Sequence, residues 1–171
     1  TVHIPAYQSC DATEVVAVCS ATERRAKDAA ARFGIPVWTT DYRTLLGRAD
    51  VDAVSISSPP FTHHAMSLAA FAAGKHVLLE KPMAVNTTEC REMLDIASRS
   101  GLRHMIAFEF RWHPGRLFIH QLLREGYIGE LRHANISLFV ASRGGSLGSA
   151  YYNWAARRDM GGARGWSGGV L

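Results

Sequence analysis

The sequence lacks the features that mark disulfide-rich and membrane proteins. Its three cysteines, Cys10, Cys19 and Cys90, are odd in number and widely spaced, so we expect reduced thiols rather than a disulfide framework or a cysteine metal site. No stretch approaches the roughly 18 uninterrupted apolar residues that a membrane span needs. The first residues carry no basic end followed by an apolar block. These absences predict a cytoplasmic protein without a membrane partner.

Neither sign of charge dominates the chain. The 171 residues include 19 basic and 15 acidic side chains, which are interleaved and give a net charge of +4. A nucleic-acid-binding protein usually gathers its positive charge in a patch or stripe. We therefore expect a solvated, mildly basic surface and no nucleic-acid partner. With 47% hydrophobic and 20% charged residues, the composition is that of a globular protein with one core, or one domain and part of another.

Three glycines mark the ends of predicted helices. The stretches "RFGIPV", "AAGKHVLL" and "RSGLRHMI" each place a glycine between a helical pattern and an apolar, strand-like run. Glycine tolerates the left-handed conformation that closes a helix. These boundaries predict strands at residues 14–19, 37–38, 52–57, 76–80 and 103–108, with helices between them.

Strands that alternate with helices predict an α/β protein with a doubly wound, Rossmann-like parallel sheet. The strands "AVSIS" and "HVLLE" are apolar on successive residues, as expected where helices cover both faces. Two helix starts also have a signal: Ser20 with Glu23, and Asn86 with Glu89, are spaced as capping pairs.

The pattern changes after residue 110. Residues 114–131 predict one amphipathic helix with a glycine-marked end, and residues 132–142 predict a longer alternating strand. Residues 144–169, which hold 8 of the 15 glycines, predict loops. We interpret residues 1–110 as one domain and residues 111–171 as the start of a second, α+β domain.

Candidate site residues follow the predicted strands, because ligands of open parallel sheets bind outside the carboxyl ends of the strands. Lys81 follows a buried strand, where partial desolvation would suit its amine to proton transfer. Equally, Glu80 and Lys81 would form a local ion pair where Pro82 ends the strand. The residues alone leave both interpretations open.

The stretch "AVSISSPPFTHHAMSLAAFAAGKHVLLEKPMAVNTTECREML" closely resembles the Gfo/Idh/MocA family of nicotinamide-dependent oxidoreductases. The resemblance spans nearly the whole chain, and "AGKHVLLEKP" is its most specific element. It implies a dehydrogenase that acts on a sugar, cyclitol or related polyol. In such a protein Lys81 would lie beside the nicotinamide and move the proton that accompanies hydride transfer.

The resemblance also implies which residues lie along the cofactor, namely Ser57, Ser58, Pro59, His63, Glu80 and Lys81. Adjacent side chains such as His63 and His64 diverge by about 100° on a helix, so we expect no metal site. Arg111 and Trp112 fall where two domains would meet, and they would either bind substrate or pack between the domains.

In this family, the choice between NADP and NAD depends on the residue at the end of the second strand. NAD-binding sheets usually hold an acidic residue there, whereas this chain has Ser20, followed by Arg24 and Arg25. This pattern favours NADP over NAD, since arginines pair with a 2′-phosphate. The alternative is that Ser20 only caps the helix and the arginines face solvent.

The family's glycine-rich turn would immediately precede "TVHIPAY", and its catalytic histidine or aspartate would follow "GGVL". The resemblance therefore implies a fragment that lacks the first strand and most of the second domain, with weak or no cofactor binding of its own. The complete protein would form a homo-oligomer through that second domain, as its relatives often do. Other functions open to this fold are a non-catalytic dinucleotide-binding regulator and an NAD-dependent glycosidase.

Overall fold

The computed structural model describes residues 2–137. In chain order the elements are α1 (His3–Gln8), β1 (Ala17–Cys19), α2 (Glu23–Phe33), β2 (Val37–Thr39), α3 (Tyr42–Leu46), β3 (Ala53–Ile56), α4 (His63–Ala72), β4 (His76–Leu79), α5 (Thr87–Ser100), β5 (His104–Ile106) and α6 (Pro114–Arg124). Two 3₁₀ turns lie at Pro60–Thr62 and Glu109–Trp112. Within residues 2–137, no helix has the length and apolar character needed to cross a membrane.

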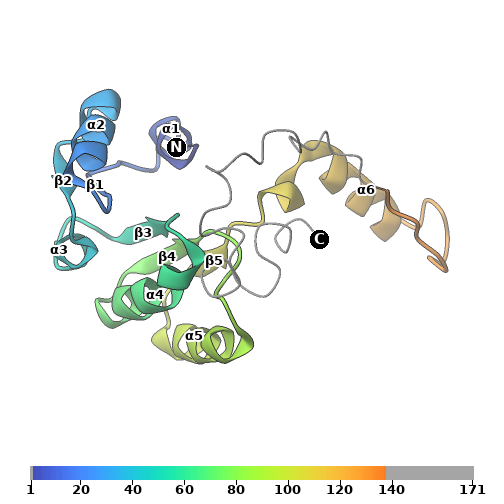
Figure 1. The fold of residues 1–171 in the computed structure, drawn as a ribbon. Coiled ribbons are helices and arrows are strands. Elements are labelled where there is room, and N and C mark those ends of the chain that lie inside the picture. Colours follow the sequence, from blue (N-terminus) through green and yellow to red (C-terminus); the bar gives the residue numbers. More distant parts are fainter. Residues whose placement is uncertain (1, 138–171) are drawn as a thin grey trace, which may run out of the picture.

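All the strand pairs are parallel, as the sequence predicted. β1 pairs with β2 in one sheet, and β3, β4 and β5 form a second sheet in that order, with β4 in the centre. Each of the five predicted strands is present. Figure 1 shows the two sheets with a helix in every connection between consecutive strands. The predicted α/β architecture is therefore confirmed.

The glycine signals for helix ends are also confirmed. Gly34 and Gly101 end α2 and α5 with φ angles of 65° and 69°, and Gly74 follows α4 with a φ of 71°. All three lie in the left-handed region, which a residue with a Cβ rarely adopts. The chain can thus turn directly from each helix into the next strand.

Only one of the two predicted helix caps is correct. Asn86 caps α5, because its Oδ1 accepts a hydrogen bond from the backbone N–H of Glu89 at 2.9 Å. Ser20 caps nothing: α2 begins at Glu23, and Thr22 is its N-cap residue. The backbone N–H of Ser20 instead donates to the Thr39 carbonyl at 3.2 Å, which extends the pairing of β1 with β2. Three residues, Ser20 to Thr22, therefore separate β1 from α2.

The core lies between the three-stranded sheet and the helices on one of its faces. α4 and α5 pack on that face and on each other (Figure 1), and Val77 and Leu79 of β4 point into the interface between sheet and helices. On β3 the alternate residues Ala53 and Ser55 are exposed. In the described part of the chain, this sheet is thus buried on one face, and the prediction of helical cover on both faces is met for that face alone.

The region after residue 110 meets the prediction in part. α6 ends at Arg124, and Gly126 and Gly129 after it take left-handed conformations with φ of 74° and 72°, so the predicted helix has the glycine-marked end that the sequence indicated. Residues 132–137 form no strand. The rest of the predicted strand and the glycine-dense loops lie outside the described residues.

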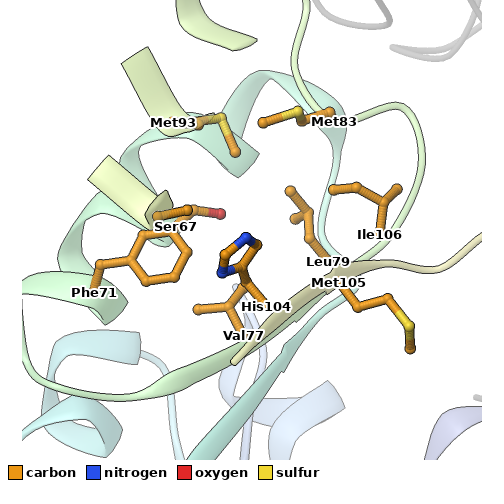
Figure 2. Close-up of a pocket in the computed structure, with 10 residues that line it drawn as sticks. Ser67, Phe71, Val77, Leu79, Met83, Met93, His104, Met105 and Ile106 are labelled. Carbon is orange, nitrogen blue, oxygen red and sulfur yellow. The ribbon is translucent and has the colours of Figure 1, made fainter. Parts of the chain in front are cut away.

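Ser67 is the one buried side chain of the described residues whose polar atom has no hydrogen-bond partner. It is 1% exposed, and its Oγ points into a small apolar cavity between α4, α5 and the sheet (Figure 2). A buried hydroxyl without a partner keeps its desolvation cost. We expect Ser67→Ala to raise the free energy of unfolding by about 1 kcal/mol, since alanine also favours the helix.

Urea unfolding of the whole protein measures this effect, with Ser100→Ala as the matched control. The Oγ of Ser100 donates to the Ala97 carbonyl at 2.8 Å and accepts from the Leu102 N–H at 3.1 Å. Its loss should lower stability by about 1 kcal/mol. A destabilised Ser67→Ala variant would contradict the assignment of an unpaired hydroxyl.

Candidate active site

The register of the three-stranded sheet brings the ends of its strands together. Ile56 of β3 and Ile106 of β5 both pair with Leu79 of the central strand β4. The next residues continue the pairing, because Glu80 N–H donates to the Ile56 carbonyl at 2.9 Å and Ala107 N–H donates to the Leu79 carbonyl at 2.8 Å. The turn formed by Glu80, Lys81 and Pro82 therefore leaves from the middle of the carboxyl edge, where ligands of such sheets bind.

The Glu80 carboxylate holds this turn to α1. His3 Nε2 donates to Glu80 Oε1 at 2.8 Å, and the backbone N–H of Lys81 donates to Glu80 Oε2 at 3.1 Å. The other ring nitrogen of His3, Nδ1, lies 3.1 Å from the Oγ of Ser55 on β3. The role of His3 was not predicted from the sequence, since its contact with Glu80 joins residues 77 positions apart and no local pattern indicates it. Glu80 thus positions the backbone of Lys81, whose side chain is partly buried.

His63 lies on the opposite side of the same turn, in the first turn of α4. It is fully buried, with Nδ1 at 2.8 Å from the Pro82 carbonyl oxygen and Nε2 at 2.8 Å from the Ser58 carbonyl oxygen. Both ring nitrogens therefore lie within hydrogen-bond distance of main-chain carbonyl oxygens, and a neutral imidazole donates its one N–H to one of them. The neighbouring His64 differs, because it is partly exposed and bonds to Glu92 at 2.9 Å. The contact of His63 with a cofactor stays a prediction.

The segment after β3 supplies hydroxyl groups to the same edge. Ser57 is exposed, whereas the Oγ of Ser58 is 2.6 Å from Thr62 Oγ1 and 3.3 Å from Met66 Sδ. Thr62 in turn donates to the Pro59 carbonyl at 2.7 Å. These bonds stabilise the turn that leads from β3 into α4, and Ser57 is left as the outward-facing hydroxyl.

The residues predicted to determine the preference for NADP or NAD lie at and after the end of β1, in the two-stranded sheet. Ser20 directly follows β1 and is partly buried, and Arg24 and Arg25 lie in the first turn of α2 with exposed side chains. Arg24 Nη1 is 3.5 Å from Asp28 Oδ2, a weak surface contact. Both guanidinium groups are therefore exposed to solvent.

Arg111 and Trp112 belong to the 3₁₀ turn that follows β5. Both are exposed, and the Arg111 guanidinium carbon is 6.0 Å from the centre of the Trp112 ring. Their assignment to substrate or to packing between domains stays a prediction. Among residues 2–137, no group of three or more His, Cys, Asp or Glu side chains is arranged to hold a metal ion.

Burial makes two of the three thiols poor nucleophiles. Burial raises the pKa of Cys19 above the ordinary value of a thiol, and the Asp41 carboxylate raises it further. Burial likewise raises the pKa of Cys90. Since the thiolate is the reactive form, a raised pKa lowers reactivity near neutral pH. Cys19, although it ends β1, is therefore unsuited to act as a nucleophile at this edge.

We expect iodoacetamide at pH 8 to alkylate the exposed Cys10 at least about tenfold faster than Cys19 or Cys90. The rates for Cys19 and Cys90 should rise as the pH approaches their raised pKa values, because the thiolate fraction rises. Peptide mass spectrometry of a time course measures the three rates. Equal rates for Cys10 and Cys19 would contradict the burial effect.

Comparison with known proteins gives a consistent picture. The model of a family described as "Oxidoreductase family, NAD-binding Rossmann fold" matches residues 1–108. The chain is similar to a dTDP-3,4-didehydro-2,6-dideoxy-alpha-D-glucose 3-reductase from Actinomadura kijaniata, with 39% identity over 130 residues that cover 75% of the chain and 39% of that protein.

Two solved structures share the fold. One is a 3-ketoreductase from Actinomadura kijaniata in complex with NADP and TDP-benzene, with a TM-score of 0.66 and 38% identity, covering 74% of this chain and 39% of the other. The second is apo scyllo-inositol dehydrogenase from Lactobacillus casei, with a TM-score of 0.71 and 25% identity, covering 75% and 39%. The chain spans less than half the length of curated relatives that it matches, namely 43%, 39% and 49% of three of them.

Proposed function

Because the chain belongs to the Gfo/Idh/MocA family of oxidoreductases with an NAD-binding Rossmann fold, we propose that the whole protein is a dehydrogenase or reductase of sugars, cyclitols or related polyols. One observation carries this proposal: the Glu80–Lys81–Pro82 turn leaves the centre of the carboxyl edge of a parallel sheet. At that point a lysine amine can reach a substrate oxygen beside a bound dinucleotide.

Lys81 moves the proton in this reaction. A bound nicotinamide dinucleotide supplies or accepts the hydride. The Lys81 amine takes the hydroxyl proton when an alcohol is oxidised to a ketone, and the ammonium form returns it when the ketone is reduced. Glu80 holds the backbone of Lys81 through the 3.1 Å bond to its N–H.

The donor groups at the carboxyl edges fit a dinucleotide. Guanidinium groups suit a phosphate and hydroxyl groups suit ribose oxygens, and both kinds lie next to the ends of parallel strands. We assign the cofactor-facing role to Ser20, Arg24, Arg25, Ser57, Ser58, Pro59, Glu80 and Lys81. The role predicted for His63 changes, because its buried ring lies against two main-chain carbonyl oxygens. NADP is favoured over NAD, because Ser20 stands where NAD-binding sheets usually hold an acidic residue and the exposed guanidinium groups of Arg24 and Arg25 suit a 2′-phosphate.

The rest of the proposal concerns the whole protein. Residues 1–110 form the dinucleotide-binding domain, and residues 111–171 begin an α+β domain where Arg111 and Trp112 face the substrate. The protein works in the cytoplasm as a homo-oligomer, and it binds neither nucleic acid nor membranes. The interleaved charge of the chain supports the absence of a nucleic-acid partner.

The test is to follow nicotinamide absorbance while the whole protein is incubated with NADP or NAD and a panel of sugars, cyclitols and their keto forms. We expect turnover with at least one member of the panel and faster turnover with the NADP pair. Dinucleotide binding without turnover would indicate a regulator. Release of a sugar from a glycoside without net change in absorbance would indicate a glycosidase, and either result would overturn the proposal.

The choice of cofactor gives a separate prediction. Replacing Arg24 and Arg25 together with alanine should raise the Kd of NADPH at least about 100-fold, since each charge-assisted hydrogen bond contributes roughly 1.5–3 kcal/mol. The Kd of NADH should change little, because it has no 2′-phosphate. Arg32→Ala, at the far end of α2, is the matched control. An equal rise in the Kd of NADPH and of NADH in the fluorescence titration would mean that the arginines do not bind the 2′-phosphate.

A further inference from the structure

His63 is placed unlike a ligand-binding histidine. Its side chain is 0% exposed, and each ring nitrogen lies 2.8 Å from a main-chain carbonyl oxygen, one from Ser58 and one from Pro82. A cofactor could reach a ring nitrogen only if the ring moved away from one of these two carbonyl groups. The imidazole therefore contacts the protein's own main chain and is not exposed to a ligand.

The two carbonyl groups belong to two different segments of the carboxyl edge. Ser58 lies in the segment that follows β3, and Pro82 directly follows Lys81 after β4. The His63 ring therefore lies within hydrogen-bond distance of both segments. On the other flank, His3 and the Lys81 N–H both bond to the Glu80 carboxylate. Lys81 is thus the middle residue of a turn whose two neighbours are each fixed by a histidine from another helix.

We infer that His63 is a positioning residue that sets the location of the Lys81 amine, an inference that rests on the proposed function for its catalytic consequence. The ring acts through the Pro82 carbonyl and touches neither substrate nor cofactor. Displacement of a catalytic group by about 1 Å can cost roughly 100-fold in rate. A turn held at only one end would allow a displacement of that size.

The experiment compares His63→Phe with three other variants of the whole protein. Phenylalanine retains a buried aromatic ring but removes both nitrogens. His63→Gln retains an amide N–H donor for one of the two carbonyl groups. His64→Phe makes the same chemical change one residue away at a partly exposed position. Met93→Ala opens a cavity at a 2% exposed core position on α5, so it lowers stability without touching the turn.

We expect His63→Phe to lower kcat by roughly 100-fold while KM and the Kd of the dinucleotide stay within about threefold, and His63→Gln to recover part of the loss. His64→Phe and Met93→Ala should retain most of the wild-type kcat. If kcat of Met93→Ala falls as much as kcat of His63→Phe, the loss in both variants is due to lowered stability. A large rise in the dinucleotide Kd of His63→Phe would make His63 a binding residue, and either outcome would overturn the inference.

A second measurement does not depend on turnover. The chain has three lysines, Lys27, Lys75 and Lys81, and the Lys75 amine is held by the Arg48 carbonyl at 2.8 Å, away from the turn. Reductive methylation followed by peptide mass spectrometry gives the rate for Lys81 relative to Lys75. We expect this ratio to change at least about threefold in His63→Phe and to stay constant in His64→Phe.

An unchanged ratio in His63→Phe would overturn the inference even where every sugar fails as a substrate. Absence of turnover in the wild-type protein would instead overturn the proposed function and leave the ratio as the measure of the Lys81 position. The two failures are therefore distinguishable.

Discussion

Lys81→Ala is expected to lower kcat of the whole protein by at least about 1,000-fold while the Kd of the dinucleotide stays within about threefold. A positioned proton donor or acceptor contributes roughly 10²- to 10⁴-fold to rate. Alanine removes the amine and leaves the backbone bond from residue 81 to Glu80 available. The substitution should therefore abolish the chemical step without disturbing the edge that we propose binds the cofactor.

Steady-state kinetics and a fluorescence titration measure the two quantities. Lys81→Arg separates proton transfer from charge, because arginine stays protonated and so cannot accept a proton. If Lys81 moves a proton, the arginine variant should fail nearly as completely as the alanine variant. Lys75→Ala is the matched lysine control and should turn over normally. Substantial turnover in Lys81→Ala would remove Lys81 from the mechanism.

Leu79→Ala is expected to lower the free energy of unfolding by about 2–5 kcal/mol, which is a large part of the stability of an ordinary domain. Leu79 is 2% exposed on the central strand β4 and belongs to the core between the sheet and helices α4 and α5. Its removal leaves a cavity next to Met93, and a close-packed core fills such a cavity only in part.

Urea unfolding of the whole protein measures this loss. Leu94→Ala makes the same change at a position that is 55% exposed on α5, and it should cost less than about 0.5 kcal/mol. Because Leu79 lies two residues before Lys81, we also expect the variant to lose activity at temperatures where it still binds the dinucleotide. A Leu79→Ala variant as stable as Leu94→Ala would mean that this strand is not the centre of the core.

Local signals in the sequence predicted most of the architecture. An apolar run followed by a turn indicates a strand, and a glycine between a helix and a strand indicates a left-handed end, so Gly34, Gly74 and Gly101 were assigned correctly. Asn86 and Glu89 form a cap because both partners lie within one turn. Such features depend on neighbours in the chain and can be recognised without the fold.

The predictions that were wrong also have physical reasons. Ser20 has the spacing of a cap, but its N–H pairs with Thr39 of a neighbouring strand, and this long-range bond overrides the local preference. The alternating pattern after residue 131 predicted a strand, but residues 132–137 form none. In both cases the outcome depends on contacts with distant parts of the chain, which a local side-chain pattern does not determine.

The site was predictable only in part. Lys81 stood out through the resemblance of the surrounding motif to a known family, whereas the residues alone left a local ion pair with Glu80 as an open alternative. The pairing of His3 with Glu80 and the two carbonyl contacts of His63 join residues far apart in the chain. Contacts of this kind follow from the assembled fold, and a single sequence holds no periodic signal for them.

The division of the strands into two sheets has a practical consequence for biochemical work. Within residues 2–137, β1 bonds only to β2 and β3 bonds only to β4, so each sheet presents a strand edge with backbone groups left over for pairing. Such edges act as templates for other chains and promote aggregation. Preparations of this segment by itself are therefore best monitored by light scattering from the first purification step, before any binding assay is interpreted.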